Sequence, residues 1–388
     1  MPARSRKVIG TLMAAILISL GATLAAARFH PSAGFSNGDV SLAQAGWRLS
    51  QPITYDNLTI FPVVSPDDAD TSEFATLDEA LASGDALVTE QGASMRRMRD
   101  GSVAPYSLNG PQVNQLVLIN RGKRPLILLA GEVVSGGKQD RVIGKDRIVP
   151  VGAAPLPLDV FCVEHGRWTP GAEQFSAAHL MVHPSVREKA AVDQDQTQVW
   201  AAVRGDTPPI GTNSQTVTVE PRALVPAISS DALGLAVESA GTQSYQKIYK
   251  SSPIGNSAET FAQEVERRFE RETRSLKGEH VVGVVVAFGP EVAWSDIFAS
   301  SELFNSYWPK LLRSYVVEAM TRPGIPRRAS LDDARDFLRP ATGHLEEESE
   351  PGIYLWRKQS EGRLAEIELD ALTPRQVTLH WLRVLHGD

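Results

Sequence analysis

The stretch that decides the fold runs from Leu128 to Trp168 and reads LLAGEVVSGGKQDRVIGKDRIVPVGAAPLPLDVFCVEHGRW. Apolar β-forming segments make up most of it, and two polar clusters interrupt them, at 136–141 and at 164–168. Short apolar runs bounded by turn residues are typical of buried strands. A solvated loop does not need charge, amide and indole groups gathered at strand ends, so the pattern predicts a site that grips a polar ligand.

The composition is that of a globular protein with a net negative charge. The chain has 388 residues, of which 42% are hydrophobic and 22% are charged, and its formal net charge is -7. This apolar content is enough to build a core and argues against general disorder. No basic block with interleaved aromatic residues occurs, so we expect no nucleic-acid partner.

The first 27 residues have the features of an export signal. Positive charges lie at Arg4, Arg6 and Lys7, and the uncharged residues 8–27 end in three alanines. A small-residue end of this kind favours cleavage by a signal peptidase. The alternative is an uncleaved membrane anchor, because about 20 apolar residues suffice to span a bilayer. In either case we expect the rest of the chain to be exported, to the periplasm or outside the cell.

The chain beyond the export signal is predicted to form one domain. Residues 28–50 read as a flexible tether, and 51–388 as a domain with a Pro/Thr/Ser-rich irregular excursion near 205–229. Strand patterns cluster first and helices mix with strands later. The expected fold class is therefore α+β: a single large β-rich domain with an antiparallel or mixed sheet and several packed helices in its second half.

Periodicity and capping residues predict the individual elements. The expected helices span 73–82 (capped by Ser72 and ended by Gly84), about 185–203, 258–276 (capped by Ser257) and 301–320, which contains Pro309. The expected strands include 86–90, 112–120, 125–134, 280–288, 353–358, 363–370 and 376–385. Residues 120–123 are predicted to join two of these strands in a hairpin.

Several separated motifs resemble one known family, the ARG and rhodanese-phosphatase-superfamily-associated protein domain. The resemblance spans roughly Leu58 to Leu385. The motifs that carry it are Gly131-Glu132-Val133-Val134, Gly137-Lys138-Gln139-Asp140-Arg141, Phe161-Cys162-Val163-Glu164, Gly166-Arg167-Trp168, Gln198-Val199-Trp200 with Val203, Ser214-Gln215-Thr216, Leu303-Phe304, Trp308-Pro309-Lys310-Leu311-Leu312-Arg313-Ser314-Tyr315 and Ala319. The family's name links it to ADP-ribosylglycohydrolases and to a rhodanese and phosphatase superfamily. The resemblance therefore implies pathways of nucleotides or ADP-ribose, but it implies no reaction and no cofactor.

The first polar cluster combines flexible backbone with cationic donors. Gly136 and Gly137 allow left-handed backbone and the close approach of a ligand. Lys138 and Arg141 supply positive charge, Gln139 supplies an amide, and an arginine can hold a phosphate or carboxylate with two hydrogen bonds. The alternative is a solvated polar turn.

The second polar cluster follows a strand in which Leu158, Val160 and Cys162 share one face. Glu164 continues that face as the strand leaves the core, so burial there would raise its pKa and suit it to acid or base catalysis. It could equally brace the structure by pairing with Arg141 or Arg167. Trp168 could stack on a ligand ring, or pack at the rim of the core.

Nucleophilic and metal chemistry are the less favoured interpretations. Cys162 is the only cysteine, and His165 lies three positions further along the strand, which places the two on opposite faces. We expect Cys162 to be a buried small hydrophobic residue. His179 and His183 have i, i+4 spacing, but Pro184 follows directly and a zincin-type glutamate is missing, so no metal ligand is predicted.

These residues predict one anion-ready site and leave its chemistry open. In the first hypothesis the domain binds a phosphorylated or otherwise anionic small molecule, derived from a nucleotide or sugar, through Glu132, Lys138, Gln139, Arg141, Arg167 and Trp168. The second is a hydrolase that uses Asp140 or Glu164 as acid or base, with Lys138 and Arg141 stabilising an anion. The third is a protein-interaction module of the cell envelope. The sequence identifies no cofactor.

Overall fold

The computed structural model describes residues 46–90, 93–97, 103–107, 115–137, 139–163, 174–205, 245, 253–322 and 325–386, all within one compact unit. Its fold class is α+β, as the sequence predicts, and antiparallel strand pairs dominate it. The expected export signal, most of the expected tether and the expected excursion near 205–229 lie outside the described residues. Among the helices described, none is long and apolar enough to cross a membrane.

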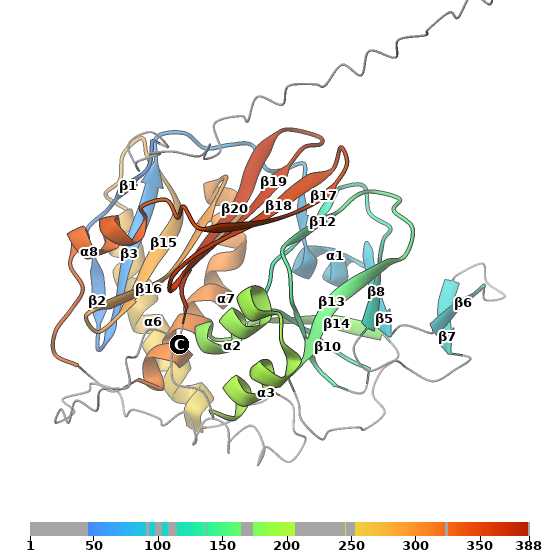
Figure 1. Ribbon diagram of the computed structural model, residues 1–388, viewed down its shortest axis with the longest axis horizontal. Coiled ribbons are helices and arrows are strands. Elements are labelled where there is room, and N and C mark those ends of the chain that lie inside the picture. Colours follow the sequence, from blue (N-terminus) through green and yellow to red (C-terminus); the bar gives the residue numbers. More distant parts are fainter. Residues whose placement is uncertain are drawn as a thin grey trace, which may run out of the picture. The chain divides into compact units, whose positions relative to one another are not determined.

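A nine-stranded antiparallel sheet is the largest element (Figure 1). Its order is β1-β3-β15-β16-β20-β19-β18-β17, and β2 also pairs with β3. The strands are β1 (Arg48–Leu49), β2 (Ile53–Tyr55), β3 (Leu58–Ser65), β15 (His280–Phe288), β16 (Glu291–Phe298), β17 (His344–Glu350), β18 (Tyr354–Glu361), β19 (Leu364–Ala371) and β20 (Val377–Leu385). Strand β3 is buried along its whole length, which is the pattern of a strand covered on both faces.

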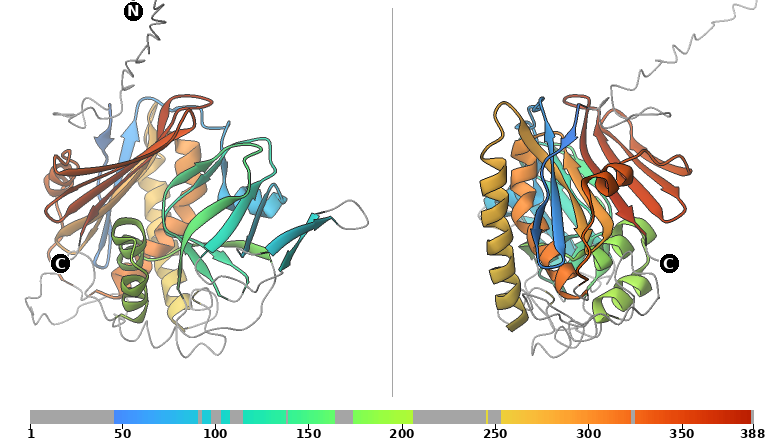
Figure 2. Two further views of the ribbon diagram at one scale, coloured as in Figure 1. Left: turned by 45° about the vertical axis from the view of Figure 1, so that its right-hand side comes forward. Right: turned by 90° about the vertical axis from the view of Figure 1, so that its left-hand side faces the viewer.

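Helices cover both faces of this sheet. The helices α6 (Pro253–Thr273) and α7 (Ser301–Met320) lie side by side along one face (Figure 2). Val284 and Val286 of β15 join their core, whereas Val285 points to the other face and packs with the short helix α8 (Leu331–Phe337). This alternation follows from the two-residue period of a strand.

Six further strands close into a barrel. Their order around the barrel is β10-β11-β13-β8-β5-β14, and closure leaves no unpaired edge. The bounds are β5 (Ala86–Glu90), β8 (Gln115–Asn120), β10 (Glu132–Ser135), β11 (Arg141–Ile143), β13 (Leu156–Cys162) and β14 (Gln174–Met181). Side chains such as Val88, Leu118 and Val160 fill the interior.

The remaining elements are short. A three-stranded sheet contains β4 (Ala75–Thr76), β9 (Leu126–Leu128) and β12 (Arg147–Val149), in which β4 and β9 form a parallel pair. The strands β6 (Ala93–Arg97) and β7 (Val103–Ser107) pair with each other. The helical segments are α1 (Leu77–Ser83), α2 (Pro184–Glu188), the π turn η1 (Lys189–Asp193) and α3 (Gln196–Arg204).

Most of the predicted elements are confirmed. Strand β5 spans the predicted residues, and β15 and the three C-terminal strands agree within a few residues. Helix α7 starts after Ser300, whose hydroxyl accepts from the N–H of Leu303, and it continues through Pro309. Helix α6 begins at Pro253, earlier than the predicted start after Ser257. Strands β16 and β17 and helix α8 were not predicted.

Other predictions are wrong for identifiable reasons. Thr76, not Ser72, caps α1, because 75–76 are held extended against β9 and Glu79 completes a capping box with Thr76. The stretch 125–134 is two strands, since Gly131 adopts a φ of 98° between them. The hairpin at 120–123 does not form: β8 pairs with β5 and β13, whereas β9 pairs with β12 and β4.

The predicted helix over about 185–203 is also wrong as a single element. It is divided into α2, η1 and α3. Gln194 has a φ of 53° and ends η1, and the carboxylate of Asp195 then caps α3 by accepting from two backbone N–H groups. A left-handed residue cannot continue a helix, so the chain turns there.

Candidate functional site

The first polar cluster lies at one end of the barrel. Strand β11 places Arg141 opposite Val134 of β10 and opposite Cys162 of β13. Directly opposed residues of antiparallel strands point to the same face, and Val134 belongs to the core inside the barrel. Arg141 therefore points into the barrel. We call this end, which carries 136–141, Cys162 and Glu90, the barrel mouth.

Gly136 and Gly137 bring the β10–β11 loop onto its own barrel. Their φ angles are 154° and 56°. A Cβ on Gly136 would lie 2.6 Å from the carbonyl oxygen of Gln174, and one on Gly137 would lie 2.7 Å from Oε1 of Glu90. The close approach that the sequence analysis assigned to a ligand is therefore made to strands β14 and β5.

The described polar residues of the loop are turned inward. Asp140 Oδ1 accepts a hydrogen bond from the Ser135 hydroxyl at 2.6 Å. The Arg141 guanidinium donates to the carbonyl oxygen of Gln139 at 3.0 Å and to its side-chain oxygen at 3.2 Å. Gln139, Asp140 and Arg141 are each at most 5% exposed, and each makes further contacts. The loop thus holds the guanidinium of Arg141 and the carboxylate of Asp140 at the barrel mouth.

The second polar cluster begins where β13 ends. Cys162 is buried, as predicted for a small hydrophobic residue. Gln196 of α3 clamps its backbone, since the Gln196 side chain accepts from the Cys162 N–H at 2.8 Å and donates to its carbonyl at 2.9 Å. The other predicted site residues, Lys138, Glu164, Arg167 and Trp168, lie outside the described residues.

Glu132 belongs to a separate ion-pair network. Its carboxylate accepts from the N–H of Leu129 at 2.7 Å and lies 2.5 Å from Nζ of Lys310 on α7. Lys310 also donates to Asp78 of α1 at 2.9 Å. Burial alone would lower the pKa of Lys310, but the two carboxylates outweigh it and raise that pKa above its ordinary value. In its described contacts Glu132 braces the barrel against α7.

A second buried network, which the sequence analysis did not single out, joins the barrel side to the large sheet. His380 of β20 lies between two carboxylates, with Nδ1 2.5 Å from Asp146 and Nε2 2.9 Å from Asp296 of β16. Arg187 of α2 reaches both oxygens of Asp296, at 2.9 and 2.8 Å. Asp146 also accepts from the N–H of Ala130 at 2.7 Å. All four ionisable side chains are at most 1% exposed.

The geometry favours a charged His380. A carboxylate can only accept hydrogen bonds, so both ring nitrogens must donate. Burial alone would lower the pKa of His380, but Asp146 and Asp296 reverse this and raise it. Asp296 also accepts from the Trp294 indole at 2.7 Å and from the Tyr315 hydroxyl. Two carboxylates, one guanidinium and one imidazolium together carry no net charge, which makes their burial tolerable.

Gly131 sits between the two networks. Its neighbour Ala130 accepts from Arg187 at 2.7 Å, and its other neighbour is Glu132. A Cβ on Gly131 would lie 2.6 Å from Cγ of Arg187. The Gly131-Glu132 pair therefore has a structural reason: the glycine admits Arg187, and the glutamate receives Lys310.

The sequence held a signal for the second network that we did not use. Asp296 and His380 are single ionisable residues inside otherwise apolar strand segments, AWSDIF and TLHWL. A charged residue in such a strand needs a buried partner, because an unpaired buried charge is very costly. The sequence does not reveal the partner of His380, because the hydrogen bond between His380 and Asp146 joins residues 234 positions apart.

His179 and His183, the two histidines with i, i+4 spacing, contact different residues. His179 on β14 is exposed and lies 3.5 Å from Asp78, whereas His183 is buried and lies 3.7 Å from Glu318 of α7. Neither belongs to a group that could hold a metal ion among the described residues. The group that could is Glu188, Asp193 and His386.

Fold and site together define an α+β protein with a closed six-stranded barrel and a nine-stranded sheet, in which buried ion pairs join β10 of the barrel to α7 and α2 to β16 of the sheet. The family model of the ARG and Rhodanese-Phosphatase-superfamily-associated Protein domain matches residues 46–384, so the chain belongs to this family. No curated protein and no solved structure matches the chain.

Proposed function

We propose that this domain binds an anionic small molecule at the barrel mouth. One observation carries the proposal: Arg141 pairs with Cys162, so the end of β13, which residues 164–168 follow in the sequence, lies at the same end of the barrel as Arg141. Mouths of β-barrels are common places for small-molecule sites. The two polar clusters of the sequence would then serve one site.

Arg141 supplies the described positive charge at the barrel mouth, beside the carboxylates of Asp140 and Glu90, so attraction of an anion depends on Lys138 and Arg167 as well. The guanidinium of Arg141 lies in the barrel interior, where the surrounding apolar core weakens screening and strengthens its field. Its hydrogen bonds to Gln139 hold it in place. In the proposal Arg141 sets the positive potential, and Lys138, Arg167 and Trp168 make the direct contacts with a phosphate or carboxylate and an adjoining ring. Glu132 supports the frame through Lys310.

A thermal-shift screen with inorganic phosphate, pyrophosphate, nucleotides, sugar phosphates and ADP-ribose tests the proposal. We expect at least one anion to raise the melting temperature, and Lys138→Ala and Arg167→Ala to reduce that shift. Arg335→Ala is the control, because Arg335 lies exposed on α8. If every anion leaves the melting temperature unchanged, or if the control loses the shift equally, binding at the barrel mouth is wrong and the protein-interaction module becomes the better hypothesis.

The hydrolase hypothesis is tested with the same ligands. In it, Asp140 or Glu164 acts as acid or base, with Lys138 and Arg141 stabilising the anion. Product formation from a stabilising ligand would support it if Asp140→Asn or Glu164→Gln abolishes turnover and keeps the thermal shift. A ligand that stays intact with the unaltered protein would exclude hydrolysis of that compound.

We further propose that residues 1–27 direct export of the domain. The positive residues before an uncharged segment and the alanines at its end support this. N-terminal sequencing of protein recovered from cells is the test. A mature N-terminus just after Ala27 would support cleavage, an intact N-terminus in the membrane fraction would support an anchor, and an intact cytoplasmic protein would contradict export.

A further inference from the structure

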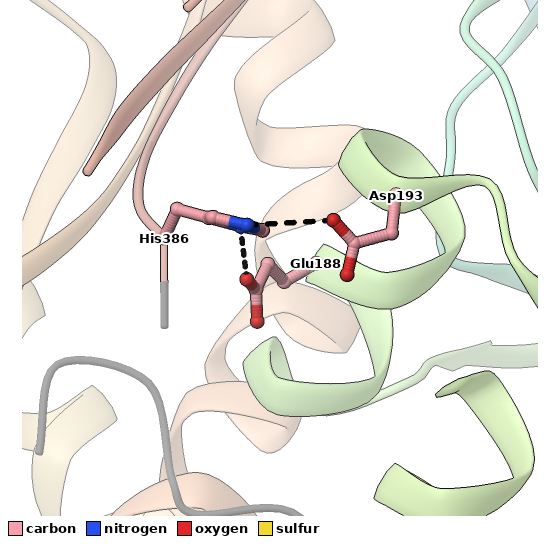
Figure 3. A group of neighbouring side chains, drawn as sticks. All are labelled: Glu188, Asp193 and His386. Carbon is pink, nitrogen blue, oxygen red and sulfur yellow. Dashed lines mark ion pairs between the residues drawn. The ribbon is translucent and has the colours of Figure 1, made fainter. Parts of the chain in front are cut away.

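Three side chains that could bind one metal ion converge where α2 and η1 meet the end of β20. Glu188 ends α2, Asp193 ends η1 and His386 follows β20 (Figure 3). One nitrogen or oxygen from each lies within 4.8 Å of the other two. The imidazole of His386 points at both carboxylates, with Nδ1 in contact with Glu188 and Nε2 3.5 Å from Asp193.

The π turn is what aligns the two carboxylates. In a regular α-helix, residues five apart are rotated by about 140° and point in different directions. A π turn closes its hydrogen bonds over five residues, so residues i and i+5 lie nearly above each other. Glu188 and Asp193 have this spacing across η1 (Lys189–Asp193). Single π turns inside helices occur frequently at functional sites.

The backbone fixes the position of His386. Its N–H donates to the carbonyl of Arg363 at 2.5 Å, and its own carbonyl accepts from the Arg363 side chain at 3.2 Å. These bonds continue the pairing of β19 with β20, so the imidazole is carried by the sheet. The third ligand is thus preorganised by an element nearly 200 positions along the chain from the other two.

The imidazole of His386 presents each of its two nitrogens to one carboxylate. Nδ1 of His386 is shielded from solvent and lies in direct contact with Glu188. The 3.5 Å separation between Nε2 and Asp193 exceeds a hydrogen-bond length. The ring therefore lies between two carboxylate oxygens, one in direct contact with it and one beyond hydrogen-bond length.

We propose that Glu188, Asp193 and His386 form a binding site for a divalent cation of the zinc class. One imidazole nitrogen and two carboxylate oxygens suit a borderline ion such as Zn²⁺, whereas Ca²⁺ prefers oxygen ligands alone. Glu188 is buried, but Asp193 and His386 are partly exposed, so an ion can enter and water can complete its coordination. Three protein ligands with an open position are typical of zinc sites that bind a further molecule.

Lys189 is the competitor that this site must overcome. Its ammonium lies 2.9 Å from Asp193 Oδ2 and 3.3 Å from Glu188 Oε1. It neutralises part of the charge of the two carboxylates and weakens their attraction for a second cation. The competing interpretation is an ion-pair cluster that only fastens the end of β20 to η1. Removing the ammonium should tighten Zn²⁺ binding if the three residues form a metal site. It should not tighten Zn²⁺ binding if they form only an ion-pair cluster.

Isothermal titration of the purified, tag-free protein with Zn²⁺, and with Ca²⁺ for comparison, distinguishes them. We expect one Zn²⁺ per chain and weaker Ca²⁺ binding. Asp193→Asn and His386→Gln should weaken Zn²⁺ binding by more than the roughly 10- to 100-fold typical of losing a group that only supports a ligand. Lys189→Gln should tighten it several-fold. His344→Gln, on the exposed strand β17, is the matched control and should bind as the parent does.

Unfolding in urea with a chelator present shows whether each variant is folded before titration. Folded Asp193→Asn and His386→Gln proteins that bind Zn²⁺ as tightly as the parent would overturn the proposal. So would a parent protein that binds no Zn²⁺, or a Lys189→Gln variant that binds it no more tightly. Any of these results would leave the ion-pair cluster as the correct interpretation.

Discussion

If His380 is charged in the folded protein, the stability of the fold should depend on pH, and removing one of its partner carboxylates should change that dependence. Asp146→Asn removes one carboxylate from the imidazole and keeps the shape of the side chain. The amide oxygen can still accept from the Ala130 N–H, and the amide nitrogen then donates to Nδ1 of His380. That arrangement requires a neutral imidazole, so the variant should lower the pKa of His380 in the folded state.

The size of the effect follows from burial. His380 and both carboxylates are at most 1% exposed, so solvent cannot replace the lost charge. Removing one partner of a buried ion pair costs roughly 3–5 kcal/mol. In the parent, the pKa of His380 is raised above the unfolded value of about 6.5. Its stabilising contribution is therefore complete below about pH 6.5 and is lost as the pH rises through the raised value. The variant should lose most at low pH.

Urea unfolding of both proteins at about pH 5.5 and about pH 8.5, on either side of the ordinary histidine pKa, measures this. The difference between parent and variant should be roughly 3–5 kcal/mol at the lower pH and smaller at the higher pH. His344→Gln, which alters an exposed histidine, should show no such dependence. A difference that is equal at both pH values, or that grows as the pH rises, would show that His380 is not the charged group that we infer.

Three further variants test other parts of the structure. Gly131→Ala should destabilise the fold by roughly 2–5 kcal/mol in urea unfolding, because a Cβ there meets Arg187 and the φ of Gly131 is 98°. Gly152→Ala, which has open space around the added Cβ, should cost only about 1–2 kcal/mol. Similar losses for the two variants would refute the packing argument. Lys310→Met should lower the free energy of unfolding by roughly 3–5 kcal/mol, because it leaves two carboxylates without their cation. Adding Glu132→Gln should recover part of this loss. A double variant that is less stable than Lys310→Met would contradict the prediction. Burial raises the pKa of Glu368 to about 8, so the parent should lose stability as the pH rises from about 4.5 to 8. Over this range the stability of Glu368→Gln should increase relative to that of the parent. Parallel curves of stability against pH for the two proteins would show that the pKa is ordinary.

Local signals in the sequence were sufficient for much of the secondary structure. The apolar runs predict β5, β15 and the C-terminal strands, and the helical periodicity predicts α7. These features depend on residues near one another in the chain, which local periodicity and capping chemistry report directly. The failures occur where partners are distant. Thr76 caps α1 because β9 holds it extended, and β8 avoids a hairpin with β9 because the barrel supplies other neighbours.

The candidate site divides in the same way. The sequence by itself determined which segments are polar at strand ends, that Cys162 is buried, and that Gly131 and Glu132 stand out from an apolar run. Only the tertiary structure decided what these residues touch: Arg141 turns into the barrel, Gly136 and Gly137 approach neighbouring strands, and Glu132 receives Lys310.

The buried networks depend entirely on the tertiary structure. Each network joins residues that are about 200 positions or more apart in the chain, such as Asp146 with His380 and Glu188 with His386. These residues meet only because strand pairing and helix packing bring them together. A pattern in the sequence reveals that a residue is out of place in an apolar strand. It cannot reveal the partner, because the energy that makes a buried charge tolerable comes from groups that the fold alone places beside it.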